Sequence, residues 1–429
     1  MKVCIIGAGS SGITAAKTLK ENGIDFDCFE KGSNIGGNWR YQNDNGMSSA
    51  YRSLHINTNR VVMAYSDFPM PDHYPMFPHH SHIIQYFEDY VTHFGVRSHI
   101  QFNTEVQDVQ RNADGSYCVT TDKGQANYRA VLVCNGHHWN PRYPEPAFDG
   151  TFTGETLHAH HYREPEQIAK KDVLVVGIGN SAVDIACESA RQSTGNKVVI
   201  STRSGAYIIP NWIWSMPFDN LANPVVAKLP LALQRVFLKT ALWLARGNQA
   251  DFGVPQPKRP PLMEHPTLSQ DLLNLCGRGL IKFKPNIKAF RGKTVVFEDG
   301  STQDFDLVVY ATGYKVTFPF LKDHTFRVED SNDFRLYKKV AHPDWPNLFF
   351  VALVQPLGAI MPLAEVQSKW IARLLNGQSS LPSPDVMRQD IEKDRQAMLK
   401  RYNQSPRHTL QVDFHPYKES IEKAMKKRA

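Results

Sequence analysis

The most constraining feature of this chain is a strand, a glycine turn and a helix at its amino end. Apolar residues 3–6 run directly into Gly-x-Gly-x-x-Gly, which comprises Gly7, Ala8, Gly9, Ser10, Ser11 and Gly12. In this fingerprint the first glycine permits a tight turn, the second lets the backbone approach a pyrophosphate, and the third lets the helix pack on the strand. The amino end of the helix offers free N–H groups and a positive dipole to phosphates.

A second strand, residues 24–30, ends in an acid, Glu30. A carboxylate in this position accepts hydrogen bonds from a ribose diol, as in sites that hold FAD. The paired glycines 36–37 indicate backbone close to a ligand, so we expect their neighbours Asn38 and Trp39 to contact the cofactor. Core packing is the alternative for Trp39.

The same design returns about 170 residues later, at apolar residues 173–176. Ala182 replaces the third glycine, a tolerated variant. The next strand ends in Ser201, Thr202 and Arg203, with no acid to repel a 2′-phosphate and a guanidinium to pair with it. We therefore expect NADP here, with Arg203 as an ordinary solvated charge as the alternative. The expected NADP contacts are Gly177, Gly179, Asn180, Ser181, Thr202 and Arg203.

Two such sites predict an α/β protein with two Rossmann-like dinucleotide-binding domains, the NADPH domain inserted into the FAD domain. A chain of 429 residues accommodates two or three domains. We expect the first part of the FAD domain at 1–150 and the NADPH domain at 151–300. The latter carries an irregular or helical insertion at about 205–265. Residues 301–429 then complete the FAD domain and add C-terminal helices. The expected chemistry is hydride transfer from nicotinamide to flavin.

Composition excludes several other classes. The 49 basic and 42 acidic residues are scattered, so no nucleic-acid stripe is expected. No apolar run reaches the roughly 20 residues of a transmembrane helix. The nearest, residues 231–245, predicts an amphipathic helix packed on its own domain, or a surface helix that touches a membrane or covers an active site.

The six cysteines form no Cys-x-x-Cys, which indicates free thiols in a reducing compartment and argues against a disulfide reductase of the same two-nucleotide plan. The first strand starts at residue 2, which leaves no room for a signal peptide, so a cytoplasmic location is expected. Histidines 79, 80 and 82 lack the carboxylates or thiolates that would complete a metal shell, so no metal is expected. Ser81 is instead predicted to cap a helix from about His82 to His93.

The most specific motif is Phe152-x-Gly154-x-x-x-His158-x-x-x-Tyr162. With both fingerprints, it makes the chain resemble the flavin-containing monooxygenases, class B flavoprotein monooxygenases, from Val3 to about Leu381. Type I Baeyer–Villiger enzymes end this motif with Trp, whereas Tyr162-Arg163 favours the branch that oxygenates heteroatoms. The hydrophobic C-terminal anchor of the mammalian members is missing, which favours a soluble member.

The resemblance implies that NADPH reduces FAD and that the reduced flavin takes up O2 to form a C4a-hydroperoxyflavin. An amine nitrogen or a sulfide then receives the distal oxygen. Baeyer–Villiger oxygenation of ketones is the alternative, and a non-catalytic nucleotide-binding protein is the remote one. The implied partners are a small-molecule substrate, O2 and a second copy in a homodimer.

The resemblance also implies roles for single residues. Asn57 is expected to be the catalytic residue, a hydrogen-bonding support of the oxygenated flavin, with Asn59 as the rival position. Thr58 and Gln355 are expected to contact the cofactor, and His158 is expected to have a structural role between the domains rather than that of a general base.

Overall fold

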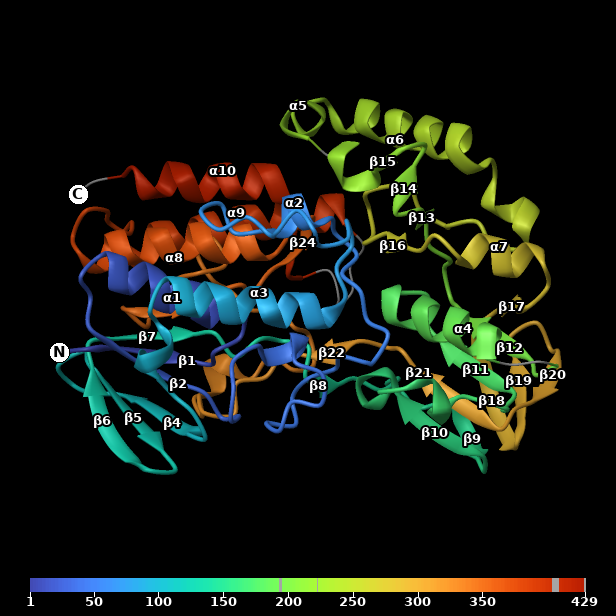
Figure 1. Cartoon of the computed structure of the whole chain (residues 1–429), viewed down its shortest axis with the longest axis horizontal. Helices are drawn as coiled ribbons and strands as arrows, with labels where there is room; N and C mark the ends of the chain where they lie inside the picture. Colours follow the sequence, from blue (N-terminus) through green and yellow to red (C-terminus); the bar gives the residue numbers. More distant parts are fainter. Residues whose placement is uncertain (193–194, 222, 403–408, 428–429) are drawn as a thin grey trace. The chain divides into compact units, whose positions relative to one another are not determined.

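The computed structural model separates into two compact units (Figure 1). It describes residues 1–192, 195–221, 223–402 and 409–427. Unit 1 combines Met1–Ala50, Leu54–Asn140 and Lys315–Ala429. Unit 2 combines Tyr51–Ser53 and Pro141–Tyr314. Each unit has a parallel sheet with helices, which confirms the α/β class and the insertion of one unit into the other.

The chain enters unit 2 at Pro141, earlier than the expected residue 151. It returns to unit 1 at Lys315, later than the expected residue 301. The reason is the pairing of strand β21 (Leu307–Tyr310), which lies beside β11 (Val173–Val176) in the sheet of unit 2. The chain also enters unit 2 briefly at Tyr51–Ser53, an excursion that the sequence pattern does not indicate.

The sheet of unit 1 has five parallel strands, and the first glycine turn follows its central strand. The order is β23 (Leu348–Phe350), β7 (Ala130–Val133), β1 (Val3–Ile6), β2 (Phe26–Phe29) and β3 (Ile100–Gln101). Val3 and Ile5 face one hydrophobic cluster, whereas Cys4 and Ile6 face another. The sheet is therefore buried on both faces, as parallel sheets are.

Helices cover one face of this sheet, and a small antiparallel sheet covers the other (Figure 1). The main covering helices are α1 (Ser10–Glu21), α3 (His80–His93), α8 (Met361–Leu375) and α10 (Phe414–Met425). The antiparallel sheet is β4 (Val106–Arg111), β5 (Tyr117–Thr121) and β6 (Gly124–Tyr128). Unit 1 also contains α2 (Arg60–Met63), α9 (Pro384–Arg401), β24 (Gln355–Leu357) and β25 (Gln411–Asp413).

Helix α3 begins at His80 rather than at about His82, so the prediction that Ser81 caps it was wrong. The cap is His79, whose Nδ1 accepts the backbone N–H of Ser81 at 3.3 Å. An imidazole nitrogen thus takes the acceptor role usual for a hydroxyl or carboxylate. In the part of the chain that the structure describes, no three His, Cys, Asp or Glu side chains are grouped to hold a metal.

The sheet of unit 2 is also parallel and five-stranded. Its order is β10 (Glu155–His158), β21, β11, β12 (Val198–Ser201) and β17 (Ile281–Lys284). Helix α4 (Asn180–Gln192) packs on β11 and β12. A second sheet shares a hydrophobic cluster with the first and consists of β20 (Thr302–Asp304), β19 (Thr294–Phe297), β18 (Ile287–Gly292) and β9 (Asp149–Phe152).

The segment between β12 and β17 contains short strands and three helices. The strands pair as β13 (Ile208–Ile209) with β16 (Thr267–Leu268) and β14 (Trp212–Ile213) with β15 (Met216–Pro217). The helices are α5 (Pro224–Ala227), α6 (Leu231–Arg246) and α7 (Leu272–Gly277).

Helix α6 is amphipathic and packs on its own unit through Leu238 and Leu242, which share a cluster with Ile209 and Ile213. Five larger apolar side chains of this helix are exposed: Leu233, Val236, Phe237, Trp243 and Leu244. No helix within the described ranges has the length and hydropathy needed to cross a bilayer.

Candidate functional site

The first glycine turn, between β1 and α1, has no room for side chains. A Cβ on Gly12 would lie 1.8 Å from the carbonyl oxygen of Gly7, and one on Gly7 (φ +98°) would lie 2.8 Å from that of Cys134. A Cβ on Gly37 would lie 3.0 Å from the Cα of Gly9, so these two backbones pass close to each other. The result is a bare backbone surface that a pyrophosphate can approach.

Helix α1 begins directly behind this turn and is fixed there by two side chains. The hydroxyl of Tyr65 donates to the carbonyl oxygen of Ser10 at 2.6 Å, and that of Ser11 donates to the carbonyl of Cys134 at 3.4 Å. The first turn of the helix contains no acidic residue. Its N–H groups, which lack intrahelical partners, and its dipole therefore favour an anion.

Glu30 is buried at the end of β2 and ties the glycine turn to the next loop. One carboxylate oxygen accepts the N–H of Ala8 at 2.8 Å; the other accepts the N–H of Gly32 at 2.9 Å and the amide of Asn45 at 3.1 Å. A carboxylate accepts about four hydrogen bonds, so roughly one acceptor position is left for a ribose hydroxyl. Glu30 is thus an anchor of the turn as well as a candidate ribose ligand.

Asn38 and Trp39 lie in a single turn of 3-10 helix, Gly37–Trp39. The Oδ1 atom of Asn38 accepts the N–H of Ser49 at 2.8 Å and its hydroxyl at 2.9 Å, so this side chain organises the following loop. Trp39 is half-buried against the main core of unit 1. Core packing thus accounts for part of the indole, and contact with a cofactor stays a prediction.

Asn57 and Asn59 have different surroundings. Asn59 is completely buried, and its Oδ1 caps α2 by accepting two backbone N–H groups at 3.0 and 3.1 Å. Asn57 and Thr58 are half-buried. The chain from Asn57 to Tyr65 ends beside the start of α1, where the Tyr65 hydroxyl donates to the carbonyl oxygen of Ser10. Since the helix cap already uses the side-chain oxygen of Asn59, Asn57 is the better candidate to meet a ligand.

Gln355 begins β24 and is half-buried. Its N–H donates to the carbonyl of Leu410 at 2.7 Å, and β24 pairs in parallel with β25, where Gln355 lies opposite Gln411. The strand pair holds the backbone of Gln355 in place, and an approach of its side chain to the flavin stays a prediction.

The second glycine turn, between β11 and α4, has room for one methyl group. A Cβ on Gly177 (φ +123°) would lie 2.6 Å from the carbonyl oxygen of Ala311, which matches the constraint at Gly7. Ala182, at the position equivalent to Gly12, is completely buried. The helix therefore stands far enough from this turn to accept the Cβ that the first turn excludes.

Strand β16 holds the second turn from outside the fingerprint. The hydroxyl of Thr267 donates to the carbonyl of Ile178, and the N–H of Leu268 donates to the Oδ1 of Asn180 at 2.9 Å. The side-chain oxygen of Asn180 is thus used within the protein. Gly179 is half-buried and Ser181 is exposed.

The end of β12 presents hydroxyl and guanidinium groups where β2 presents a carboxylate. Ser201 is buried, and its hydroxyl donates to the carbonyl of Pro285 at 2.7 Å. Thr202 is half-buried and accepts the N–H of Gly205 at 3.3 Å, whereas Arg203 is exposed. Thr202 and Arg203 are therefore the residues of this group that a 2′-phosphate can reach.

A half-buried acidic pair behind the second turn was not predicted. Asp184 and Glu188 lie one turn apart on α4; the hydroxyl of Tyr51 donates to Asp184 and that of Tyr162 donates to Glu188, both at 2.5 Å. Burial raises the pKa of Asp184 to about 6. Spacing of the two acids by four residues was a usable signal for a shared helix face, but nothing in the sequence placed Tyr51 there.

His158 of the signature motif is buried and held on both ring nitrogens. Its Nδ1 accepts the N–H of His160 at 3.0 Å, and its Nε2 lies 3.3 Å from the carbonyl of Arg142. Burial is the largest cause of a pKa of about 4, so the ring is neutral near neutral pH and its Nε2–H donates to that carbonyl. These contacts support a structural role.

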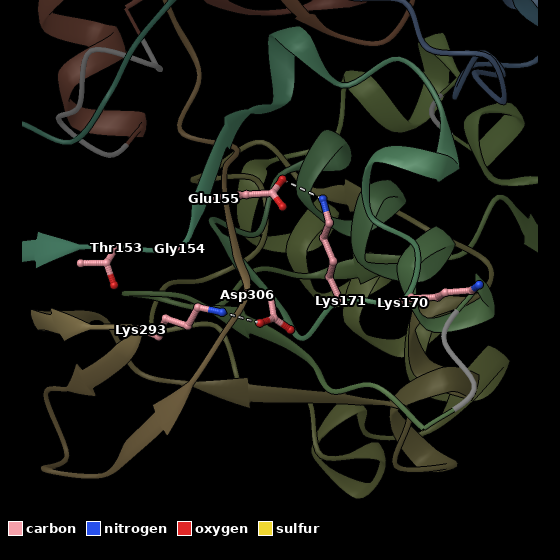
Figure 2. A pocket seen from close by; sticks show the side chains of 7 residues that line it. All are labelled: Thr153, Gly154, Glu155, Lys170, Lys171, Lys293 and Asp306. Atoms are coloured by element: carbon pink, nitrogen blue, oxygen red, sulfur yellow. Dashed lines mark hydrogen bonds and ion pairs between the residues drawn. The ribbon is translucent and has the colours of Figure 1, made fainter.

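A cavity of about 560 Å³ lies at the opposite edge of the unit 2 sheet (Figure 2). Two ion pairs line it: Lys171 with Glu155 at 2.7 Å, and Lys293 with Asp306 at 3.1 Å. Glu155 begins β10 and Asp306 directly precedes β21, so the cavity lies near the amino ends of these strands. Nucleotides bind beyond the carboxyl ends of such strands, so this cavity is separate from the second glycine turn.

The family model described as flavin-binding monooxygenase-like matches residues 1–428. Flavin-containing monooxygenase 5 of Rattus norvegicus is 40% identical over 96% of this chain and 80% of its own length. Dimethylaniline monooxygenase [N-oxide-forming] 2 of Mus musculus is 36% identical over 98% and 82%.

Solved structures show the same fold. An S-allyl-L-cysteine S-oxygenase from Allium sativum superposes with a TM-score of 0.73 at 27% identity, covering 100% of this chain and 89% of its own. An open cyclohexanone monooxygenase gives 0.72 at 18% identity, covering 98% and 97%, a likeness of fold alone. These matches and the two bare glycine turns lead to one conclusion: the chain belongs to the flavin-containing monooxygenase family and is an NADPH-dependent, FAD-containing monooxygenase.

Proposed function

We propose that this enzyme oxygenates soft nucleophiles, the nitrogen of amines or the sulfur of sulfides. The observation that carries the proposal is the end of the signature motif, where Tyr162 replaces the Trp of type I Baeyer–Villiger enzymes and Arg163 replaces the Pro or Asp that follows it. The Tyr162 hydroxyl donates a hydrogen bond to Glu188, and a Trp at this position would have no hydroxyl to do so. Relatives whose names specify N-oxide formation and S-oxygenation support the same assignment.

We also propose that FAD binds at the first glycine turn and NADP at the second. The contrast between Glu30 and the pair Thr202 and Arg203 supports this order. A free ribose diol suits a carboxylate, whereas a 2′-phosphate requires its absence and gains from a guanidinium. The close approach of Gly9 to Gly37 gives the first turn the bare backbone that the FAD pyrophosphate needs.

When bound, FAD reduced by NADPH supplies the activated oxygen. The residues of the chain would bind and orient the cofactors and the substrate, and they would exclude water. The first glycine turn and the start of α1 hold the phosphates, and Glu30 accepts a ribose hydroxyl. The Asn57 carboxamide would donate a hydrogen bond to the flavin and so help to orient it. The substrate nitrogen or sulfur would itself supply the nucleophilic lone pair, so no side-chain nucleophile is required.

The substrate class is tested by supplying thioanisole, dimethylaniline and phenylacetone separately to purified enzyme with NADPH and O2. We expect sulfoxide and N-oxide in step with NADPH oxidation, and ester from the ketone at a lower rate. Ester as the main product would favour the Baeyer–Villiger alternative, for which the shared fold of cyclohexanone monooxygenases is the motivation. Protein that binds no flavin and oxidises no NADPH would favour the non-catalytic alternative.

The role of Asn57 is tested by Asn57→Ala. Loss of one hydrogen bond to the flavin should divert NADPH oxidation from product to H2O2, roughly tenfold in the product-to-peroxide ratio, with flavin retained. Asn59→Ala is the control, because it removes the α2 cap and should cost about 1 kcal/mol of stability without changing that ratio. An unchanged ratio in Asn57→Ala contradicts the assignment.

We further propose a cytoplasmic enzyme that forms a homodimer. All six cysteines are free and five are buried, as suits a reducing compartment. The exposed apolar side chains of α6 offer a surface for self-association. Light scattering during size-exclusion chromatography tests the dimer, and a monomeric mass at micromolar concentration contradicts it.

A further inference from the structure

A second cavity, of about 330 Å³, lies entirely within unit 1. Helices α9 and α10, strand β25 and residues 333–339 line it. None of the glycine-turn residues contributes to its wall. The oxygenation chemistry proposed above makes no use of it.

Gln411, the first residue of β25, contributes to the wall of this cavity. Its side chain is 97% buried (3% exposed), and neither Oε1 nor Nε2 has a hydrogen-bond partner among the described residues. An unpaired buried amide costs about 1–3 kcal/mol. A ligand that offers both an acceptor and a donor would remove this cost.

A strained turn directs a lysine to the same cavity. Lys338 and Lys339 both have left-handed backbone, with φ of +51° and +57°, in a tight turn closed by Tyr337 and Ala341. Such turns strongly prefer Asn-Gly, and two lysines here carry strain. The hydroxyl of Tyr417, which also lines the cavity, donates to the carbonyl of Lys338 at 2.6 Å and holds the turn.

Among the described residues, Lys339 has a neutral hydrogen-bond partner and no direct ion pair, although the carboxylates of Asp333 and Asp394 in the same wall act on its charge. Its Nζ donates to the carbonyl of Thr409 at 3.1 Å. Desolvation lowers the pKa of this ammonium, which an anion would reverse.

The three carboxylates of the wall already have basic partners among the described residues. The pairs are Asp333 with Arg395 at 3.0 Å, Asp413 with Arg401 at 2.7 Å and Asp394 with Lys338 at 3.7 Å. Lys339 and the exposed Arg335 then leave the wall with an excess of positive charge.

The rest of the wall is apolar. Phe334, Leu336, Ile391, Met398 and Val412 contribute to it. A compact hydrophobic tail therefore fits beside the polar end formed by Gln411 and Lys339.

We propose that this cavity binds a small carboxylate that carries a neighbouring hydroxyl group and an apolar tail. The Lys339 ammonium pairs with the carboxylate, which also accepts the Nε2–H of Gln411. The ligand hydroxyl donates to Oε1 of Gln411. A 2-amino acid fits less well, because its ammonium would lie near Lys339.

The test uses four probes with one aromatic tail: mandelate, phenylacetate without the hydroxyl, phenylethanediol without the carboxylate, and phenylglycine with an ammonium. Calorimetric titration into FAD-loaded enzyme should show that mandelate binds most tightly. Each of the other probes should bind about tenfold or more weakly, the equivalent of one lost hydrogen bond or ion pair.

Two variants assign the contacts. Lys339→Gln should abolish the preference for mandelate over phenylethanediol, and Gln411→Leu should abolish its preference over phenylacetate. Lys322→Gln is the control, a lysine of the same unit outside the cavity. Gln411→Leu should melt at least as high as the parent, because it removes two unpaired buried atoms.

The proposal is overturned if mandelate shows no saturable binding, or if neither variant changes the ranking of the probes. If a variant fails to fold, the affinities of the probes for the parent enzyme provide the test. Phenylacetate and phenylethanediol binding as tightly as mandelate would contradict the proposal.

Discussion

The two glycine turns share one pattern but differ in how closely helix and turn approach. In the first, a Cβ at position 12 would lie 1.8 Å from a carbonyl oxygen; in the second, Ala182 already carries one and is completely buried. A Cβ on Gly7 and a Cβ on Gly177 would lie at nearly the same distance from a carbonyl oxygen, 2.8 and 2.6 Å. The turn itself is thus equally tight in both units, and the spacing of the helix is what differs.

The turns also differ in what holds them. Glu30, from the neighbouring strand, accepts the N–H of Ala8 and fixes the first turn from inside the fingerprint. The second has no such carboxylate and is held by Thr267 and Leu268 of β16. The residue that follows the second strand therefore anchors the turn in unit 1, whereas the equivalent residue of unit 2 does not.

The largest expected effect comes from substitutions at the third glycine position of the fingerprints, which Gly12 occupies in the first and Ala182 in the second. Gly12→Ala drives a methyl group into a backbone carbonyl and should cost about 3 kcal/mol or more, with loss of bound flavin. Ala182→Gly should cost only about 1 kcal/mol and keep both cofactors. Flavin absorbance and urea unfolding measure both. Retention of flavin by Gly12→Ala would show that the two turns have the same room.

Arg203→Gln comes next. If the guanidinium pairs with the 2′-phosphate, its loss removes about 1.5–3 kcal/mol and raises the KM for NADPH roughly 10- to 100-fold, with the KM for NADH unchanged. Arg191→Gln is the matched control, since this exposed arginine of α4 pairs with Asp271 at 2.6 Å. Equal changes for both nucleotides would contradict recognition of the phosphate.

Titration of Asp184 should make the stability of unit 2 depend on pH. Burial raises the pKa of Asp184 to about 6 from 3.8, so the folded state holds a proton that the unfolded state has released. Its contribution to stability is full below the unfolded value and is lost as pH rises through the folded one. The loss is at most about 3 kcal/mol, and less where solvent reaches this half-buried carboxyl.

Asp184→Asn keeps an acceptor for Tyr51 and should remove this loss. We expect it to stabilise unit 2 at about pH 8 but not at about pH 4, as measured by urea unfolding. The exposed Asp251 supplies the control variant Asp251→Asn. If the difference in stability between Asp184→Asn and the parent is the same at about pH 8 as at about pH 4, the raised pKa of Asp184 is contradicted.

The sequence predicted what depends on neighbours along the chain. The strand, turn and helix at residues 3–21 follow from apolar runs and glycine spacing, and the structure has them at β1 and α1. The contrast between Glu30 and Arg203 is equally visible in the pattern.

What escaped prediction depends on partners distant in sequence. The pairing of β21 with β11 moved the second domain boundary, and no local pattern indicates which sheet a buried strand joins. The contact of Tyr51 with Asp184 spans 133 positions. The His79 cap was missed for a different reason, since imidazole is an uncommon helix cap.

The smallest expected effect tests the contact of β16 with the second turn. Thr267→Val removes the hydroxyl that donates to Ile178 and should cost about 1 kcal/mol, with weaker binding of NADP and unchanged binding of FAD. Thr18→Val is the control: its hydroxyl is also buried and donates to a carbonyl, that of Thr14, but it touches neither turn. Hydrogen exchange should rise at residues 177–181 only in Thr267→Val. Faster exchange at residues 7–12 instead would mean that β16 does not distinguish the two turns.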